Sequence, residues 1–243
     1  MSRPLFLRKL RKYVATLPAL AFGFMANPAF STVVTINAAG IPNSGSSATF
    51  LGSTLTATGG SFTKTTTTGI NPSTAIGVSG GALSSEVDIS GEKLRLSFGA
   101  TGAIVNEITI GLLYLNGVAG NVVNEAVQFQ TNAGSTCASG AVAFCILSAS
   151  GVYKGSIVGV QNLSPATAGN GGIFKITNPF GSELISTIDF LPWAIRGEGS
   201  ANSDFGLVSV SYTTTAIPEP GTLALVSLGL LGLGIAGSRR ARG

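Results

Sequence analysis

The stretch Lys93-Leu94-Arg95-Leu96-Ser97-Phe98 alternates polar and apolar side chains without a break. Successive side chains of a β-strand point to opposite faces of the sheet, so this alternation predicts a strand with one wet face. Its two leucines and Phe98 should lie in the core, and Lys93, Arg95 and Ser97 should face water. The stretch therefore favours a sheet that is packed on one side only, as in an antiparallel sandwich.

Similar runs recur on both sides of this strand, and Gly, Asn, Ser and Pro separate them. The further candidate strands are Val33–Ile36, Ile108–Leu112, Val127–Gln130, Val152–Val160, Ile173–Ile176, Leu184–Phe190 and Phe205–Tyr212. No long window of helical periodicity interrupts them between Thr32 and Ala216. About eight to eleven short strands predict an all-β antiparallel sandwich, with a jelly roll as one form of it. A parallel β-helix is the alternative, and the lack of a fixed repeat period counts against it. Residues 42–85 are rich in Gly, Ser and Thr, and fit either long loops or weakly alternating strands.

The composition excludes several classes of function. The chain of 243 residues contains no histidine, which removes the Ser-His and Cys-His catalytic pairs and all histidine metal ligands. Its formal charge of +4 comes from its two ends, because five basic residues precede Tyr13 and three follow Ser238. The segment between them is acidic overall and has no basic patch to neutralise phosphates. We therefore expect no binding to nucleic acid.

The first 31 residues have the pattern of a secretory signal peptide. A basic stretch that ends at Lys12 precedes the apolar run from Val14 to Ala26, and the helix-breaking Asn27-Pro28 follows it. Small residues precede the bond between Ser31 and Thr32, which is the predicted cleavage site, with cleavage after Ala29 as the alternative. An uncleaved anchor helix is the other interpretation, but the apolar run is short for a span of about 20 residues.

The last residues, 217–243, form a tripartite tail. Pro218-Glu219-Pro220 comes first, an apolar run of 17 residues from Gly221 to Gly237 follows, and Arg239, Arg240 and Arg242 close the chain. As a helix the run would be about 26 Å long, just enough to cross a bilayer. The arginines would remain cytoplasmic, which leaves residues 32–216 on the outer side. Both ends of the chain thus predict the same topology.

This tail resembles the PEP-CTERM protein-sorting signal of Gram-negative bacteria. The resemblance is carried by Pro218-Glu219-Pro220, the predicted transmembrane helix Thr222–Gly237 and the arginine cluster, and covers only the last 26 residues or so. It implies that an exosortase, a membrane protease, recognises the tail and that the protein reaches the cell surface or the exopolysaccharide matrix of a biofilm. The alternative is an ordinary C-terminal membrane anchor.

Cys137 and Cys145 are the only two cysteines, and both lie in the predicted exported segment. A disulfide between them is therefore the expected state. No histidine is present to activate either thiol as a nucleophile.

Candidate chemistry rests on carboxylates and one tryptophan. Glu86 and Asp88 stand two residues apart, and Glu198 and Asp204 flank a Gly/Ser/Asn loop. Two of these carboxylates could hydrolyse a glycosidic bond, but the simpler interpretation places them in solvent on strands and loops. No regular metal-binding motif is present, although oxygens of Asp189, Glu198, Asn202 and Asp204 could gather around a calcium ion.

Trp193 could stack on a sugar ring if it were exposed, and core packing is the more ordinary role. The leading hypothesis is a non-enzymatic surface or matrix protein that associates with polysaccharide. A carboxylate-based glycoside hydrolase is one alternative. A carbohydrate-binding module is another, and it would need Trp193, Tyr153 or Phe180 exposed on one face.

Overall fold

A computed structural model describes residues 31–67, 72–81, 85–88, 91–115, 125–132, 144–148, 153–154, 159–167, 170–193, 204–215 and 230. For 144–148, 153–154 and 215 only the backbone is described. In these residues the fold is all-β, with one short 3-10 turn at Ala38–Gly40. The strands form two seven-stranded sheets, in which every pair is antiparallel.

The first sheet has the order β11-β12-β7-β14-β5-β4, and β1 also pairs with β14. Its strands are β1 (Ser31–Asn37), β4 (Ser61–Thr66), β5 (Thr74–Ser79), β7 (Ala103–Leu113), β11 (Gly159–Ser164), β12 (Gly172–Thr177) and β14 (Gly206–Thr215). The second sheet has the order β10-β9-β8-β13-β6-β3-β2. Its strands are β2 (Ser47–Phe50), β3 (Ser53–Thr58), β6 (Lys93–Phe98), β8 (Ala126–Thr131), β9 (Phe144–Ser148), β10 (Tyr153–Lys154) and β13 (Thr187–Pro192).

One hydrophobic core joins the two sheets into a sandwich. It takes Leu94, Leu96 and Phe98 from β6, and the aromatic rings of Phe129 and Phe190 meet edge to face with centroids 5.7 Å apart. The first sheet contributes the opposing side chains: Phe62, Ile76, Val78, Val105, Ile108, Ile110, Phe174, Ile176, Leu207, Val210 and Tyr212. The alternation read in Lys93–Phe98 is confirmed, because its three apolar residues are buried while Arg95 is exposed.

The remaining strand predictions are confirmed in part. The Gly/Ser/Thr-rich segment 42–85 forms four strands, β2 to β5, rather than long loops. The candidate strand Val152–Val160 is divided between β10 and β11, which belong to different sheets. The candidate Leu184–Phe190 begins later than expected, because Ile185 makes only an isolated bridge to Ala103 before β13 starts at Thr187.

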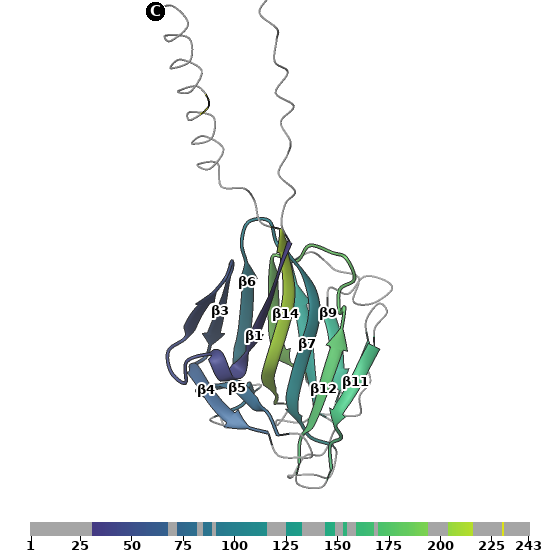
Figure 1. The fold of residues 1–243 in the computed structure, drawn as a ribbon. Helices are drawn as coiled ribbons and strands as arrows, with labels where there is room; N and C mark the ends of the chain where they lie inside the picture. Colours follow the sequence, from purple (N-terminus) through teal and green to yellow (C-terminus); the bar gives the residue numbers. More distant parts are fainter. Residues whose placement is uncertain are drawn as a thin grey trace, which may run out of the picture.

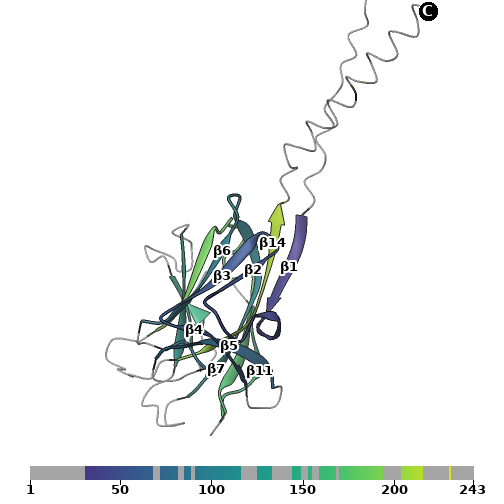
Figure 2. The ribbon, with the colours of Figure 1, turned by 90° about the vertical axis from the view of Figure 1, so that its left-hand side faces the viewer.

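The two ends of β14 define two ends of the sandwich. At the first, Ser31 pairs with Thr215, so the described parts nearest both termini meet there, as Figures 1 and 2 show at the tips of β1 and β14. We call this the tail end. At the other, Asp204 and Phe205 lead into β14 next to the end of β7. We call this second end the acidic end, for the side chains described next.

Candidate functional site

Four carboxylic side chains gather at the acidic end: those of Glu86, Asp88, Glu125 and Asp204. The sequence predicted that acids such as these lie in solvent. Asp88 is 4% exposed, Asp204 2% and Glu125 1%, and Glu86 is partly buried. The expectation that Glu86, Asp88 and Asp204 face solvent is therefore wrong. Glu198, which was paired with Asp204 in that expectation, lies outside the described residues.

Backbone pairing brings these acids together from distant parts of the chain. Val87 and Phe205 form an antiparallel bridge, in which the Val87 amide donates to the Phe205 carbonyl at 2.8 Å. The residues on either side of that bridge are Glu86 and Asp88 on one segment and Asp204 on the other. Asp88 and Asp204 consequently stand opposite each other, an arrangement of like charges that is unfavourable on a sheet.

Glu125 joins the cluster from the start of β8. Its amide donates to the Tyr114 carbonyl at 3.0 Å, and the Tyr114 amide donates to Glu125 Oε2 at 2.7 Å. These two hydrogen bonds fix the end of β7 to the start of β8 across the opening between the sheets. Glu125 also forms a side-chain hydrogen bond with Asp204.

The pKa values in this cluster are strongly displaced. Burial, followed by the charge of Asp204, raises the pKa of Glu86 to about 9. Burial and then Glu125 raise the pKa of Asp204 to about 9, although its hydrogen bond with Glu86 acts in the opposite direction. Burial raises the pKa of Tyr114 to about 12, and the charges of Glu86, Glu125 and Asp204 add to the shift. Both carboxyl groups therefore strongly disfavour the ionised form in this environment.

Several carboxylate oxygens in this region accept no hydrogen bond. They are Oε2 of Glu86, Oδ1 of Asp204 and Oε1 of Glu92, all of them buried atoms. The other oxygen of Glu92 accepts a hydrogen bond from the Asp88 amide at 3.1 Å. A buried oxygen without a partner costs free energy, so each of these atoms requires an explanation.

The backbone around the cluster is tightly constrained. Leu112, near the end of β7, has a φ of +63°, which is costly for a residue with a Cβ. Gly81 lies against the Asp88 carboxylate, and a Cβ at this position would collide with it. The packing of Gly81 therefore leaves the Asp88 carboxylate little room to move on that side.

Asp189 has a different role from the one considered in the sequence. It stands on β13 and pairs with Arg95 (Nε to Oδ1, 2.5 Å) and Lys93 (Nζ to Oδ2, 3.4 Å) of the adjacent β6. Burial opposes its ionisation, but the hydrogen bond from Arg95 and the charges of Lys93 and Arg95 hold its pKa below the ordinary value. Of the predicted calcium set, Asp189 is thus already paired with two cations, whereas Glu198 and Asn202 lie outside the described residues, so the set as a whole stays a prediction.

No ready-made metal site exists among the described residues, since no three of their His, Cys, Asp or Glu side chains form a group that could hold an ion as they stand. The acidic cluster is therefore a group of buried carboxyl side chains and not a metal coordination shell.

The aromatic residues considered for sugar binding do not share one exposed face. Phe180 is 1% exposed and belongs to the core. Trp193 is partly buried, and its amide donates to the Ala126 carbonyl at 2.8 Å. The side chain of Tyr153 lies outside the described residues. The platform that the carbohydrate-binding module requires is therefore not formed by Phe180.

The predicted disulfide stays a prediction. Cys145 lies on β9, where its backbone is the partner of Phe129 on β8. Cys137 lies outside the described residues.

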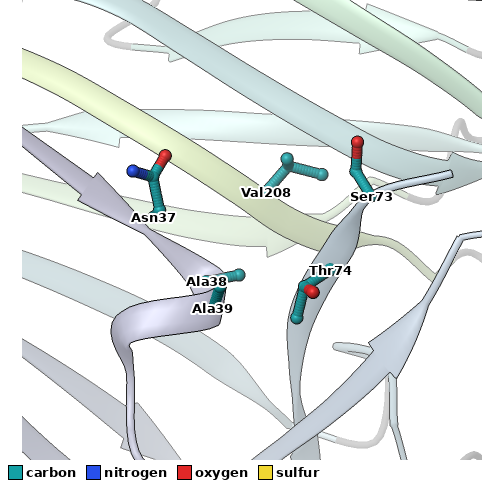
Figure 3. Close-up of a pocket in the computed structure, with 6 residues that line it drawn as sticks. All are labelled: Asn37, Ala38, Ala39, Ser73, Thr74 and Val208. Carbon is teal, nitrogen blue, oxygen red and sulfur yellow. The ribbon is translucent and has the colours of Figure 1, made fainter. Parts of the chain in front are cut away.

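One hollow of about 290 Å³ lies between the 3-10 turn, the start of β5 and β14. Figure 3 shows its lining residues: Asn37, Ala38, Ala39, Ser73, Thr74 and Val208. None of them carries a charge, so this hollow offers no acid, base or metal ligand.

The comparisons with known proteins identify the tail alone. Residues 216–240 match the family model of the PEP-CTERM protein-sorting motif. No curated protein and no solved structure matches the chain. The chain thus carries the sorting motif that its tail resembles, and this motif implies export and sorting to the cell surface by an exosortase.

The described part of the chain contains no helix with the length and apolarity that a membrane span requires. The predicted signal helix, the transmembrane helix and the residues Pro218, Glu219, Pro220, Arg239, Arg240 and Arg242 lie outside it.

Sequence reasoning missed two members of the acidic end, Tyr114 and Glu125, and the neighbouring Glu92. Only the pairing of strands far apart in the chain brings Glu125 to Asp204, and no spacing in the sequence reports that contact. The one available signal was the ratio of acids to bases in the middle of the chain, which leaves several carboxylates without a basic partner.

Proposed function

We propose that this chain is an exported precursor whose tail an exosortase cuts and whose β-sandwich is retained at the cell surface or in the exopolysaccharide matrix. The observation that carries the proposal is the match of residues 216–240 to the PEP-CTERM sorting motif, which begins one residue after β14 ends. Residues 1–31 are the signal peptide, 32–216 the β-sandwich and 217–243 the sorting segment. Pro218-Glu219-Pro220 is the recognition element.

The order of the segments gives each a physical role. The prolines keep the chain extended outside the membrane, where neither a sheet nor a helix can protect it from a protease. The apolar run holds the precursor in the inner membrane, and Arg239, Arg240 and Arg242 stop it from passing through. Each glycine in the run lowers helix stability by about 1 kcal/mol relative to alanine, which makes the span easier to unwind than a leucine-rich anchor.

The tail end of the sandwich supports a position close to the bilayer. Residues 216–220 join β14 to the apolar run and reach at most about 18 Å when fully extended. Three large apolar side chains are exposed in the described sandwich: Val33, Leu51 and Leu184. All three belong to this end, and we call them the apolar rim.

Pairing and hydrogen bonds place the rim around the last residues of β14. Val33 is the partner of Thr213, and the Leu51 carbonyl accepts a hydrogen bond from the Tyr212 hydroxyl at 3.1 Å. Leu184 precedes Ile185, which bridges to Ala103, and Ala103 is the partner of Thr214.

A structural, carbohydrate-associating role in the matrix fits the body better than catalysis. The described hollow contains no carboxylate, and the acids that meet at the acidic end are buried rather than arranged around a cleft. A glycoside hydrolase needs an acid and a second carboxylate that both reach the substrate.

The experiment is mass spectrometry of the protein recovered from the cell surface of an exosortase-containing host. A mature C-terminus between Ile217 and Gly221 is expected, and an intact Gly243 would reduce the tail to a simple anchor. Changing Arg239, Arg240 and Arg242 to Ala should lower the amount of processed protein. The matched control changes Lys64 and Lys175 to Ala in the body, which removes basic charge without altering the tail.

A further inference from the structure

We propose that the apolar rim is a membrane-contact surface, through which the sandwich rests on the outer side of the bilayer while its tail is still attached. The occupant of the rim is the interfacial layer of the lipid. This inference rests on the proposed function, since it takes the apolar run of the tail to span the membrane. It adds that the sandwich itself touches the lipid, with its tail end facing the bilayer.

The position of the exposed apolar side chains is the first support. Such side chains are ordinary where they stand singly on a protein surface, and they then need no explanation. In the described part of residues 31–215, however, all the large apolar side chains that are exposed stand at the tail end: Val33, Leu51 and Leu184. Residues 216–220 lead from this same end to the apolar run.

The rim comes from three segments that lie around the last residues of β14. Val33 stands on β1, the strand that pairs with the end of β14. Leu51 lies in the turn between β2 and β3, where a Cβ on the next residue, Gly52, would lie 3.9 Å from the Thr214 methyl group. Leu184 precedes the residue that bridges to the start of β7. The tips of β1 and β14 mark this end in Figures 1 and 2. The rim therefore lies around the point at which the chain leaves the sandwich.

The distribution of charge is the second support. The tail end is formed by residues 31–34, 50–53, 98–103, 182–186 and 212–215, and Glu183 is the only charged residue among them. The cations of the described sandwich stand on strands outside these segments: Lys64, Lys93, Arg95 and Lys175. Because it costs free energy to take an ionised group out of water, this end can approach the acyl chains more easily than the charged faces of the sheets.

The short connection to the membrane is the third support. Residues 216–220 reach at most about 18 Å when fully extended, so the tail end cannot move far from the bilayer. A contact within a tethered chain forms at a high effective concentration, so side chains that bind lipid weakly can still hold the sandwich in place. Cutting the tail removes the tether, and the mature sandwich then leaves the bilayer, because three side chains alone bind it only weakly and reversibly.

The experiment uses the full chain with its tail uncut, purified from the membranes of a host without exosortase. It is placed in nanodiscs of phosphatidylethanolamine and phosphatidylglycerol, with and without bromine on the upper acyl carbons, which quenches tryptophan emission at short range. Leu51→Trp adds an indole to the rim, and Gln161→Trp, on the exposed edge strand β11, is the matched control. Trp193 is the only tryptophan of the unaltered chain, and its emission is subtracted.

Bromolipid should remove about half of the added emission of Leu51→Trp, because an apolar group that binds at the interface lies about 5–10 Å inside it. The emission of Gln161→Trp should not change. Since a substitution in the turn could alter its shape, Leu184→Trp is a second rim probe with the same expected loss. Circular dichroism checks that each variant is folded.

The proposal is overturned if bromolipid leaves the emission of both rim probes unchanged, or if it quenches Gln161→Trp equally. It is also overturned if the rim probes are shielded from iodide in the water but not quenched by bromolipid, since a second copy of the chain would then cover the rim.

Co-elution with the nanodiscs separates this failure from a failure of the proposed function. A chain that co-elutes while its rim probes stay unquenched overturns the contact and leaves the membrane-held precursor intact. A chain that does not co-elute overturns both proposals, because its tail is then no membrane anchor.

Discussion

The tail end and the acidic end of the sandwich differ in whether their buried polar atoms have hydrogen-bond partners. At the tail end, the Tyr212 hydroxyl is hydrogen-bonded to Ser53 Oγ at 2.6 Å and to the Leu51 carbonyl at 3.1 Å, and its ring packs edge-on against Phe98. At the acidic end, Asp204 Oδ1 and Glu86 Oε2 are buried without a hydrogen-bond partner. One end satisfies its polar atoms within the chain, whereas the other leaves two carboxyl oxygens without a partner in the chain.

The two ends therefore make opposite contributions to the stability of the folded state. A satisfied buried network adds to the stability of the folded state. Buried carboxyl oxygens without a hydrogen-bond partner subtract from it. We therefore expect variants in the buried network around Tyr212 to act on folding alone.

The largest effect should come from Phe98→Ala. Phe98 is 8% exposed and packs on Tyr212 with ring centroids 4.8 Å apart. Removing the ring should lower the free energy of unfolding by about 3–5 kcal/mol, because a cavity replaces the lost contacts. Urea denaturation followed by circular dichroism measures it. The loss should be equal at pH 5 and pH 8, and a loss that changes with pH would contradict the separation of the two ends.

The strands of this fold can be predicted from the sequence where their polar and apolar residues alternate. β6 alternates cleanly, and its buried and exposed faces are those that the sequence indicates. The segment from β2 to β5 is less readable, because Thr and Ser fit either face of a sheet and Gly weakens the alternation. Gly77, for example, stands in the middle of β5 with no room for a Cβ beside the Ser85 carbonyl.

The candidate site is far less predictable from sequence. Asp88, Glu125 and Asp204 meet only because β5 and β7 end, and β8 and β14 begin, at the same edge of the sandwich, and this depends on strand order. The sequence suggested exposure for Asp88 and Asp204 because isolated acids are usually exposed. Their burial follows from the bridge between Val87 and Phe205, which local residue patterns do not encode.

A smaller effect is expected from Asp189→Asn, which removes a paired carboxylate from the outer face of the second sheet. The Arg95 side chain is 45% exposed, so water screens the pair and the loss at pH 7 should be about 1 kcal/mol. The pKa of Asp189 is lowered in the folded chain, so its contribution is present above the ordinary value of 3.8 and disappears as the pH falls through the folded value. Urea denaturation at pH 7 and pH 3 should show the variant and the unaltered chain converging in acid.

The acidic end should show the opposite pH dependence. There the folded pKa values of Glu86 and Asp204 are raised from 4.5 and 3.8 to about 9, so the folded chain holds more protons than the unfolded chain between these limits. Asp88 and Glu125 face the same cluster and disfavour the ionisation of Asp204 further. The free energy of unfolding should therefore fall as the pH rises from about 4 to 9, in both Asp189→Asn and the unaltered chain. Urea denaturation of both chains across this pH range separates the contribution of Asp189 from that of the acidic end.

The smallest effect on folding should come from the apolar rim, where Val33, Leu51 and Leu184 are changed together to Ser. These side chains are 65%, 66% and 54% exposed, so the free energy of unfolding should change by less than about 0.5 kcal/mol for each. Binding to phosphatidylethanolamine–phosphatidylglycerol vesicles and the rate of tail cleavage in a pulse-chase experiment should both decrease. The reason is that, in the proposed topology, the short connection to the apolar run would hold this end near the bilayer, where exposed apolar side chains gain from contact with lipid.

The matched control for the rim changes Gln161 and Asn162 of β11 to Ser. Both residues are exposed, but they lie on the strand at the far edge of the first sheet rather than around the end of β14. This control should bind vesicles and be cleaved at the unaltered rate. If the rim variant behaves like the control, the tail end contributes only the tether, and its exposed apolar residues have no part in sorting. If cleavage slows while the stability of the sandwich is unchanged, the tail end presents the sorting segment to its protease, and the two ends of the molecule serve two separate tasks.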